Sequence, residues 1–379
     1  MNLDGFATPL SLFGLYQSPP GHYRDALSLP ASSVSTVIEL DQRQDVITKN
    51  DSLESTGTPA RQRAVLVLGA GRSGTSLATR AIQAVGVELG DDFKPPSRKN
   101  PSGFFEDAAL LRLSKKLRRA LGLRPDSLRL LDESVWDGPV VAPFFDEFAA
   151  TIRTRFDGVP VWGFKYARTM RLLPFWVRLF QQMDIEPSYV MPIRNPLSVA
   201  RSRAKLDAHR GHQENSDLEW LVNVVPYFEL VRDSRLVVMD YDRLVTEPIP
   251  QMERVATRLD LPLTNGNRGA MDDFANKFLR AGLRHTRFTI EDLIEDRRIN
   301  PLLRQAYLLL DRLAVDDLDS ASAELWSTWQ EINAGVNRLG PVLSRLDGLE
   351  RDLRFAKWNP LSPFAAAWQE YKKFRGLRR

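Results

Sequence analysis

Four short runs of apolar residues divide the middle of the chain, and stretches with helical spacing separate them. The runs span residues 64–68, 159–165, 188–194 and 235–241. Unbroken apolar runs of this length are typical of strands buried on both faces of a parallel sheet. The alternation with helical stretches therefore predicts an α/β fold, with a doubly wound parallel sheet flanked by helices. Pro192 lies inside the third run and removes a backbone donor, which predicts an edge strand or a strand end there.

The pattern changes at both ends of this region. Residues 1–62 are rich in Ser, Thr, Pro, Asp and Gln without a sustained period, which predicts a flexible or loosely docked extension. Beyond residue 285 the strand signal disappears. We therefore expect an ordered domain over 63–285 and a helical C-terminal extension over 286–379.

Apolar residues in the C-terminal extension recur at alternating steps of four and three. They are Leu325, Trp329, Ile332, Val336, Leu339, Leu343 and Leu346. This spacing forms a heptad seam over 325–346, which Gly340-Pro341 interrupts. Two interpretations remain open: a pair of helices packed on their own domain, and a homodimer joined through the seam.

The last segment of the chain mixes aromatic and basic side chains. The aromatic members are Trp358, Phe364, Trp368, Tyr371 and Phe374, and the basic ones are Lys372, Lys373, Arg375, Arg378 and Arg379. Such a mixture suits peripheral contact with an anionic membrane surface, and a solvated basic tail is the alternative interpretation. No apolar run is long enough to cross a bilayer, and the N-terminus lacks a secretory charge pattern. We expect a cytoplasmic protein, either free or peripheral at a membrane.

Composition excludes several kinds of chemistry. The chain of 379 residues has no cysteine, which excludes disulfides, thiolate metal sites and cysteine nucleophiles. Its four histidines leave little material for a histidine metal site, and we expect no metal. The net charge is +4, without a long basic stripe interleaved with aromatic residues before the C-terminus, so we expect no nucleic-acid partner.

The first apolar run ends in a glycine-rich stretch that leads into a predicted helix. Glycines let the backbone approach an anion, and the N–H groups of the first helical turn point toward it. Arg72 adds a positive charge to this loop, while Thr75 and Ser76 add hydroxyl donors. The candidate anion-binding residues are Gly71, Arg72, Ser73, Gly74, Thr75 and Ser76.

The loop alone admits several interpretations. Gly69, Gly71 and Gly74 fit the G-x-G-x-x-G pattern of dinucleotide-binding folds, and Glu88 lies near the position of a ribose-binding acid. A nucleoside-triphosphate P-loop is disfavoured, because Thr75 stands where that motif needs its lysine. A tight turn without a ligand is the structural alternative.

A second motif lies at the end of the third apolar run. Arg194 is followed by Asn195-Pro196, and Ser202 lies eight residues after the arginine. The fork of Arg194 suits a phosphate group, and Ser202, two turns into the predicted helix, adds a hydroxyl. An ion pair between Arg194 and a nearby acid is the structural alternative. Lys165 ends the second run at the sheet edge where ligands bind in open α/β folds.

Together these motifs resemble those of the sulfotransferases that use 3′-phosphoadenosine 5′-phosphosulfate (PAPS). The segment 72–76 resembles the 5′-phosphosulfate loop of that family, and 194–202 resembles its 3′-phosphate motif. Lys165 looks like the lysine of a Lys-Asp-Pro-Arg segment, although Tyr166 and Ala167 replace Asp-Pro. Further similar segments are 103–106 with Glu106, 240–244 with Tyr241 and 283–285 with Arg284. The resemblance covers residues 63–285.

The resemblance implies a sulfotransferase fold and transfer of a sulfuryl group from PAPS to an acceptor hydroxyl or amine. Arg72 and Lys165 would stabilise the charge that grows on the leaving oxygen. Glu106 would serve as the base, with Asp107 in reserve. Glu106 lies where a loop meets a predicted helix, so a role at the positive helix end is the structural alternative. Arg194, Ser202, Tyr241 and Arg284 would contact the nucleotide.

Two other functions stay open from the sequence. One is a nicotinamide-dependent oxidoreductase that uses the G-x-G-x-x-G loop. The other is a non-catalytic nucleotide fold that serves as an interaction module through the C-terminal helices. The acceptor is also open among carbohydrates, lipid-linked glycans, peptide tyrosine and small metabolites.

Overall fold

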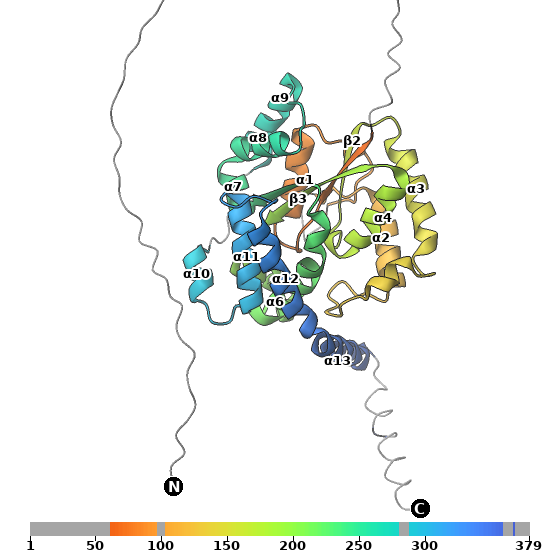
Figure 1. Cartoon of the computed structure of the whole chain (residues 1–379), viewed down its shortest axis with the longest axis vertical. Helices are drawn as coiled ribbons and strands as arrows, with labels where there is room; N and C mark the ends of the chain where they lie inside the picture. The colour runs from red at the N-terminus through yellow and green to blue at the C-terminus, as the bar shows by residue number, and fades with distance from the viewer. Residues whose placement is uncertain (1–60, 97–102, 280–287, 359–366, 368–379) are drawn as a thin grey trace, which may run out of the picture. The chain divides into compact units, whose positions relative to one another are not determined.

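The described part of the chain is built around a four-stranded parallel sheet. The structure is a computed structural model that describes residues 61–96, 103–279, 288–358 and 367. The strands are β1 Arg63–Val67, β2 Val161–Lys165, β3 Glu186–Ile193 and β4 Arg235–Asp240, in the order β2-β1-β3-β4 (Figure 1). All three neighbouring pairs are parallel. The predicted α/β class with a parallel sheet flanked by helices is confirmed.

The two faces of the sheet bury different halves of each apolar run. Ala64 and Leu66 of β1 point into one apolar cluster, whereas Val65 and Val67 point into another. Successive side chains of a strand alternate between faces, so an unbroken apolar run requires helices on both. This requirement explains why the runs contain no polar alternation.

Helices cover the face of Val65 and Val67. This layer consists of α1 Thr75–Ala84, α7 Tyr241–Thr246, α8 Pro248–Arg258 and α9 Asn265–Asp273, followed by the π-helix η5 Phe274–Phe278. The opposite face carries α2 Ala108–Ala120, α3 Ala142–Phe156, α4 Leu173–Met183, α6 Gln213–Val224, α11 Pro301–Ala314 and α12 Ala323–Arg338. The remaining helices are η1 Glu133–Asp137, η2 Met170–Leu172, α5 Pro196–Ala204, η3 His209–Gly211, η4 Val225–Val231, α10 Ile290–Glu295 and α13 Gly340–Trp358.

Pro192 lies near the end of an interior strand. β3 pairs with β1 on one side and with β4 on the other, so the expectation of an edge strand is wrong. The pairing with β1 stops at Val190, two residues before the proline, while pairing with β4 continues to Ile193. The proline therefore lies just beyond the last residue of β3 that pairs with β1, which agrees with the strand-end alternative.

The heptad positions of the C-terminal helices serve mainly this chain's own core. The side chains of Leu325, Trp329, Ile332 and Val336 are at most 1% exposed in the cluster that also contains Ala64 and Leu66. The Trp329 indole N–H also donates to the carbonyl of Val225 at 3.1 Å. Residues from both sides of position 285 thus share one apolar core. A second copy could reach these four side chains only by opening that core.

No helix in the described ranges is long and apolar enough to cross a membrane. Residues 1–60 of the N-terminal extension expected over 1–62, and most of the aromatic and basic C-terminal segment, lie outside the described residues.

Candidate active site

The carboxyl ends of the four strands meet at one edge of the sheet, because the strands are all parallel. β1 leads into the glycine-rich loop, and β2 ends at Lys165. Arg194 directly follows β3, and Tyr241 directly follows β4. Open α/β sheets bind their ligands at this edge. Strand order therefore brings four segments that are distant in sequence to one place.

Backbone geometry explains the glycines of the loop. Gly69 and Gly74 have φ angles of 103° and 89°, in the left-handed region that side chains disfavour. A Cβ on Gly74 would lie 2.3 Å from the ring of Tyr241, so only glycine lets this ring pack against the loop. Arg72 also has a positive φ, of 78°. Ser73 is buried, and its hydroxyl has no hydrogen-bond partner among the described residues.

One group of predicted residues gathers at the arginine of this loop. The Arg72 Nε donates to the Ser202 hydroxyl of α5 at 3.0 Å. The Arg194 guanidinium lies 4.2 Å from the centre of the Tyr241 ring, a cation–π distance. Burial lowers the pKa of Arg72, and the nearby positive charge of Arg194 lowers it further. The Arg194 Nε is buried and lacks a hydrogen-bond partner in the described ranges. Two arginines held close together with an unused donor fit an anionic ligand.

A second group gathers at the other end of the loop. The Lys165 Nζ lies 3.0 Å from Glu106 Oε1 and 3.2 Å from the Ser76 hydroxyl, and both charged side chains are at most 4% exposed. Lys94 approaches the other Glu106 oxygen at 3.4 Å and stacks 3.4 Å above the Phe104 ring. Burial lowers the pKa of Lys165, although the charge of Glu106 opposes this shift. Lys165 thus lies between a carboxylate and the first turn of α1.

Asp107 has a different position from Glu106. It is the N-cap of α2, and its side chain accepts from the N–H groups of Ala109 and Leu110 at 3.1 and 2.9 Å. Its other oxygen pairs with Arg155 at 2.9 Å. The helix end is therefore capped by Asp107, and the Glu106 side chain points toward Lys165 instead.

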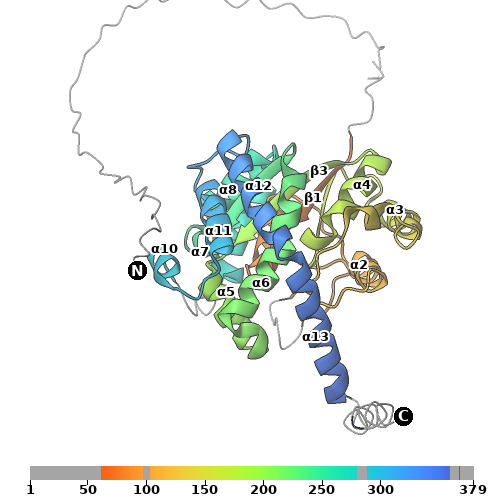
Figure 2. The same ribbon diagram turned by 60° about the horizontal axis from the view of Figure 1, so that its bottom comes forward.

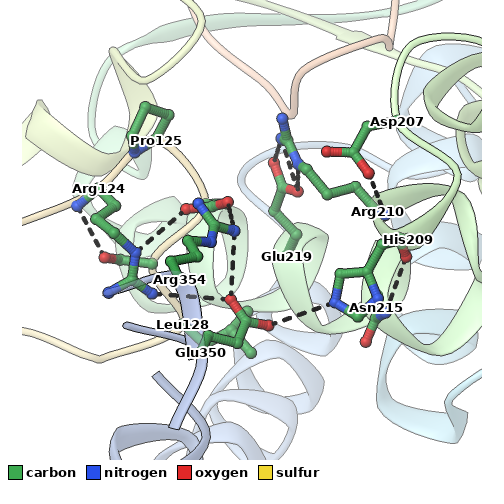
Figure 3. Close-up of polar contacts among 12 residues, drawn as sticks. Arg124, Pro125, Leu128, Asp207, His209, Arg210, Asn215, Glu219, Glu350 and Arg354 are labelled. Atoms are coloured by element: carbon green, nitrogen blue, oxygen red, sulfur yellow. Dashed lines mark hydrogen bonds and ion pairs between the residues drawn. The ribbon is translucent and has the colours of Figure 1, made fainter. Parts of the chain in front are cut away.

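Sequence reasoning did not single out the charged layer behind the loop. Arg203 of α5 is buried, donates to the Gly71 carbonyl at 3.3 Å, and lies 3.5 Å from Glu219. Burial lowers the pKa of Arg203 to about 10. Arg210 donates to Glu219 from Nη2 at 2.6 Å and from Nε at 3.1 Å (Figure 3), and Arg168 approaches the same carboxylate at 3.6 Å. Burial alone would raise the pKa of Glu219, but these three arginines lower it.

Two residues singled out from the sequence, Arg284 and Glu88, are not found at this edge of the sheet among the described residues. Arg284 lies outside the described residues. Glu88 pairs with Trp162, which lies near the start of β2 and three residues before Lys165. The Glu88 side chain accepts from the N–H of Gly90. At about 3.3 Å per residue, this position is roughly 10 Å from the carboxyl edge. Glu88 is therefore poorly placed to bind the ribose of a dinucleotide at the loop.

Comparisons with known proteins give distant similarities in structure. No family model matches the sequence, and no curated protein matches it. The sulfotransferase domain of the Synechococcus PCC 7002 olefin synthase aligns with 14% identity over 73% of this chain and 94% of its own, at a TM-score of 0.36. Sulfotransferase STF9 of Mycobacterium avium aligns with 15% identity over 73% of this chain and 76% of its own, at 0.38. Sulfotransferase STF1 of Mycobacterium tuberculosis H37Rv aligns with 14% identity over 62% of this chain and 76% of its own, at a TM-score of 0.34.

Proposed function

We propose that this chain is a sulfotransferase that binds PAPS at the carboxyl edge of its sheet and transfers the sulfuryl group to an acceptor hydroxyl. One observation carries the proposal: a single loop touches two sequence-distant groups of the residue types that this reaction needs. Arg72 contacts Ser202 at one end of the loop, and Ser76 contacts Lys165 beside Glu106 at the other.

The arginine end of the loop suits the nucleotide's 3′-phosphate. Arg194 offers a buried donor that no described residue uses, and Ser202 supplies a hydroxyl from α5. The Tyr241 ring packs against Gly74 and offers an apolar surface beside them. A doubly charged phosphate at this point would offset the repulsion between Arg72 and Arg194. We therefore assign the binding of the 3′-phosphate to Arg194 and Ser202.

The lysine end of the loop suits the chemical step. In the proposed reaction the acceptor oxygen forms a bond to sulfur, while the bond from sulfur to the bridging phosphate oxygen breaks. Glu106 takes the acceptor proton, and the electron pair of the broken bond stays on the leaving adenosine 3′,5′-bisphosphate. Negative charge thus passes from the carboxylate to the leaving oxygen. Lys165 contacts both Glu106 and Ser76, so it can stabilise the charge at either position.

Nucleotide binding tests the proposal directly. We expect calorimetry to give binding of adenosine 3′,5′-bisphosphate and little binding of NAD⁺. Arg194→Ala should weaken the bisphosphate by about 100-fold, since it removes a charged hydrogen-bonding partner, and weaken adenosine 5′-phosphosulfate much less. Arg201→Ala is the matched control, because Arg201 is an exposed arginine on α5, the helix that follows Arg194.

Equal losses for both nucleotides would refute the 3′-phosphate role of Arg194. Transfer is then measured with radiolabelled PAPS and a lysate of the source organism, followed by fractionation of the labelled product. Binding of the bisphosphate without any labelled product would favour a non-catalytic interaction module. Preferential binding of NAD⁺ would instead favour the oxidoreductase.

A further inference from the structure

The helix α13 carries a narrow apolar stripe that the described chain leaves uncovered. Of the nine exposed large apolar side chains in the described ranges, four lie on this helix: Val342, Leu346, Leu349 and Leu353, which are 58%, 37%, 40% and 62% exposed. Their steps of four, three and four residues place them within about 60° of one another around an α-helix. This width is that of a coiled-coil seam.

A different side of α13 contacts the rest of the chain. Leu343 is buried against Leu128 and Val222, and Asp347 pairs with Arg124 at 2.9 Å. Glu350 lies between Arg124 and His209, at 3.7 and 4.0 Å (Figure 3). Arg354 pairs with Asp126, in the loop before Leu128. At 100° per residue, these positions are centred about 100° away from the middle of the stripe. These contacts fix the helix to the rest of the chain and leave the stripe exposed.

The burial of the heptad seam changes at Gly340-Pro341. Before this break its apolar positions point into the core, as Val336 does. After it Leu343 still packs inward, whereas Leu346 is exposed and belongs to the new stripe. The break forms the first two residues of α13. The stripe is thus a separate surface from the buried seam.

We propose that this stripe pairs with the same stripe of a second copy of the chain. The charges beside it fit such a pair. Arg345 and Asp352 flank the stripe on one side, and Glu350 flanks it on the other. In a parallel helix pair Arg345 faces Glu350 of the other copy, and in an antiparallel pair it faces Asp352 of the other copy. Either orientation opposes unlike charges.

A lipid surface fits the stripe less well. Helices that lie on anionic membranes present a broad apolar face bordered by basic residues. Here the stripe is narrow, and Glu350 and Asp352 border it with Arg345. These carboxylates would meet anionic headgroups of like charge, whereas a second copy offers them an arginine. The mixed charge therefore favours self-association.

Sedimentation velocity of the full chain over a concentration series tests this proposal. The four side chains of the stripe bury little area for an interface, so we expect a concentration-dependent dimer with a dissociation constant of roughly micromolar size. Replacing two leucines of the stripe by aspartate, Leu346→Asp with Leu349→Asp, should raise that constant about 100-fold. Val140→Asp is the control for an exposed apolar residue outside α13, with 51% exposure.

A second pair of variants tests the flanking charges without removing apolar surface. Arg345→Glu places like charges across the interface and should weaken the dimer about three- to tenfold. Arg351→Glu makes the same charge change on the same helix, at a position that points away from the stripe, and should leave the dimer unchanged.

Three results would overturn the proposal. The first is a wild-type chain that stays monomeric at every concentration, and the second is a dimer that neither the leucine nor the Arg345 variant weakens. The third is a monomer that binds phosphatidylcholine–phosphatidylglycerol vesicles and loses this binding with Leu346→Asp and Leu349→Asp, which would assign the stripe to a membrane. Circular dichroism of each variant confirms that the chain is folded.

Discussion

Glu106 and Asp107 are neighbouring carboxylates with different surroundings. The Asp107 oxygens accept two backbone N–H groups and pair with Arg155, so both oxygens hold the start of α2 in place. The Glu106 side chain instead pairs with the ammonium groups of Lys165 and Lys94. Lys94 is one-third exposed and can move aside for an acceptor. Of the two carboxylates, Glu106 is the better placed to exchange a proton with a substrate.

Substitution separates the two carboxylates experimentally. Glu106→Gln keeps an acceptor for Lys165 and removes the proposed base, so we expect transfer of the radiolabel to fall by about 10²- to 10⁴-fold. Bisphosphate affinity should stay nearly unchanged. Asp107→Ala should instead lower the free energy of unfolding by about 2–4 kcal/mol, because it removes an N-cap and leaves Arg155 unpaired. Urea unfolding and calorimetry on both variants check this contrast, and a Glu106→Gln enzyme with full transfer would end the base assignment.

Whether a site residue could be predicted from the sequence depends on whether its role follows from its local position or from contacts with distant segments. Arg72, Lys165 and Arg194 could be selected because each ends a strand or lies in the loop that follows one. Arg203 could not be selected, because its contact with Gly71 joins residues that are 132 positions apart. Its ion-pair partner Glu219 on α6 also pairs with Arg168 and Arg210, which come from two further segments of the chain. Local spacing holds no signal for such a cluster.

At the scale of elements, helix α7 depends on a carboxylate with an unusual proton affinity. Asp240 ends β4 and caps α7, where its side chain accepts from the Arg243 N–H at 2.8 Å. Burial raises the pKa of Asp240 to about 6, and the nearby charge of Asp242 contributes to the rise. In the unfolded chain an aspartate titrates near pH 4, at about 3.9. The folded state therefore binds this proton more tightly than the unfolded state does.

The sign of the resulting pH dependence follows from this difference. Asp240 contributes its full stabilisation below about pH 4, and that contribution is lost as the pH rises to about 6. The loss is about 2–3 kcal/mol for a shift of this size. Asp240→Asn keeps the capping oxygen and does not titrate. We expect the variant to match the wild type near pH 4 and to exceed its unfolding free energy by about 2–3 kcal/mol at pH 7. Urea unfolding at several pH values measures the difference, and a variant that is less stable at pH 7 would contradict it.

The strands and helices could be predicted from the sequence better than the neighbours against which they pack. The apolar runs predicted four buried strands because a parallel sheet covered on both faces needs no polar alternation. Pro192 left open whether its strand was an edge, since the sequence does not say where the neighbouring strand ends. The same limit applies to the heptad seam: 3.5-residue spacing describes a helix face but not whether its partner is this chain or another copy.

At the scale of the whole molecule, the two C-terminal helices are attached to the rest of the chain in different ways. Trp329 and its neighbours place α12 inside the main core, whereas α13 is held by Leu343 and by ion pairs with the segment around Arg124. Stability is not uniform in such a structure: buried elements open with the whole molecule, and elements attached at the rim open alone. We expect α13 to be the less protected of the two helices in hydrogen exchange.

Removing one carboxylate from this attachment should affect α13 alone. One oxygen of Asp347 accepts from Arg124 at 2.9 Å and from the Leu128 N–H at 2.8 Å, so Asp347→Ala leaves two partly buried donors without this acceptor. The cost of about 1–3 kcal/mol should speed amide exchange in α13 about 10- to 100-fold. Exchange in α12 and β3 should not change, because these elements open only with the core. Arg351→Ala, an exposed position on the same helix, is the control. Faster exchange in α12 as well would mean that the two helices open as one unit, and that the Asp347 contacts stabilise the core rather than the attachment of α13.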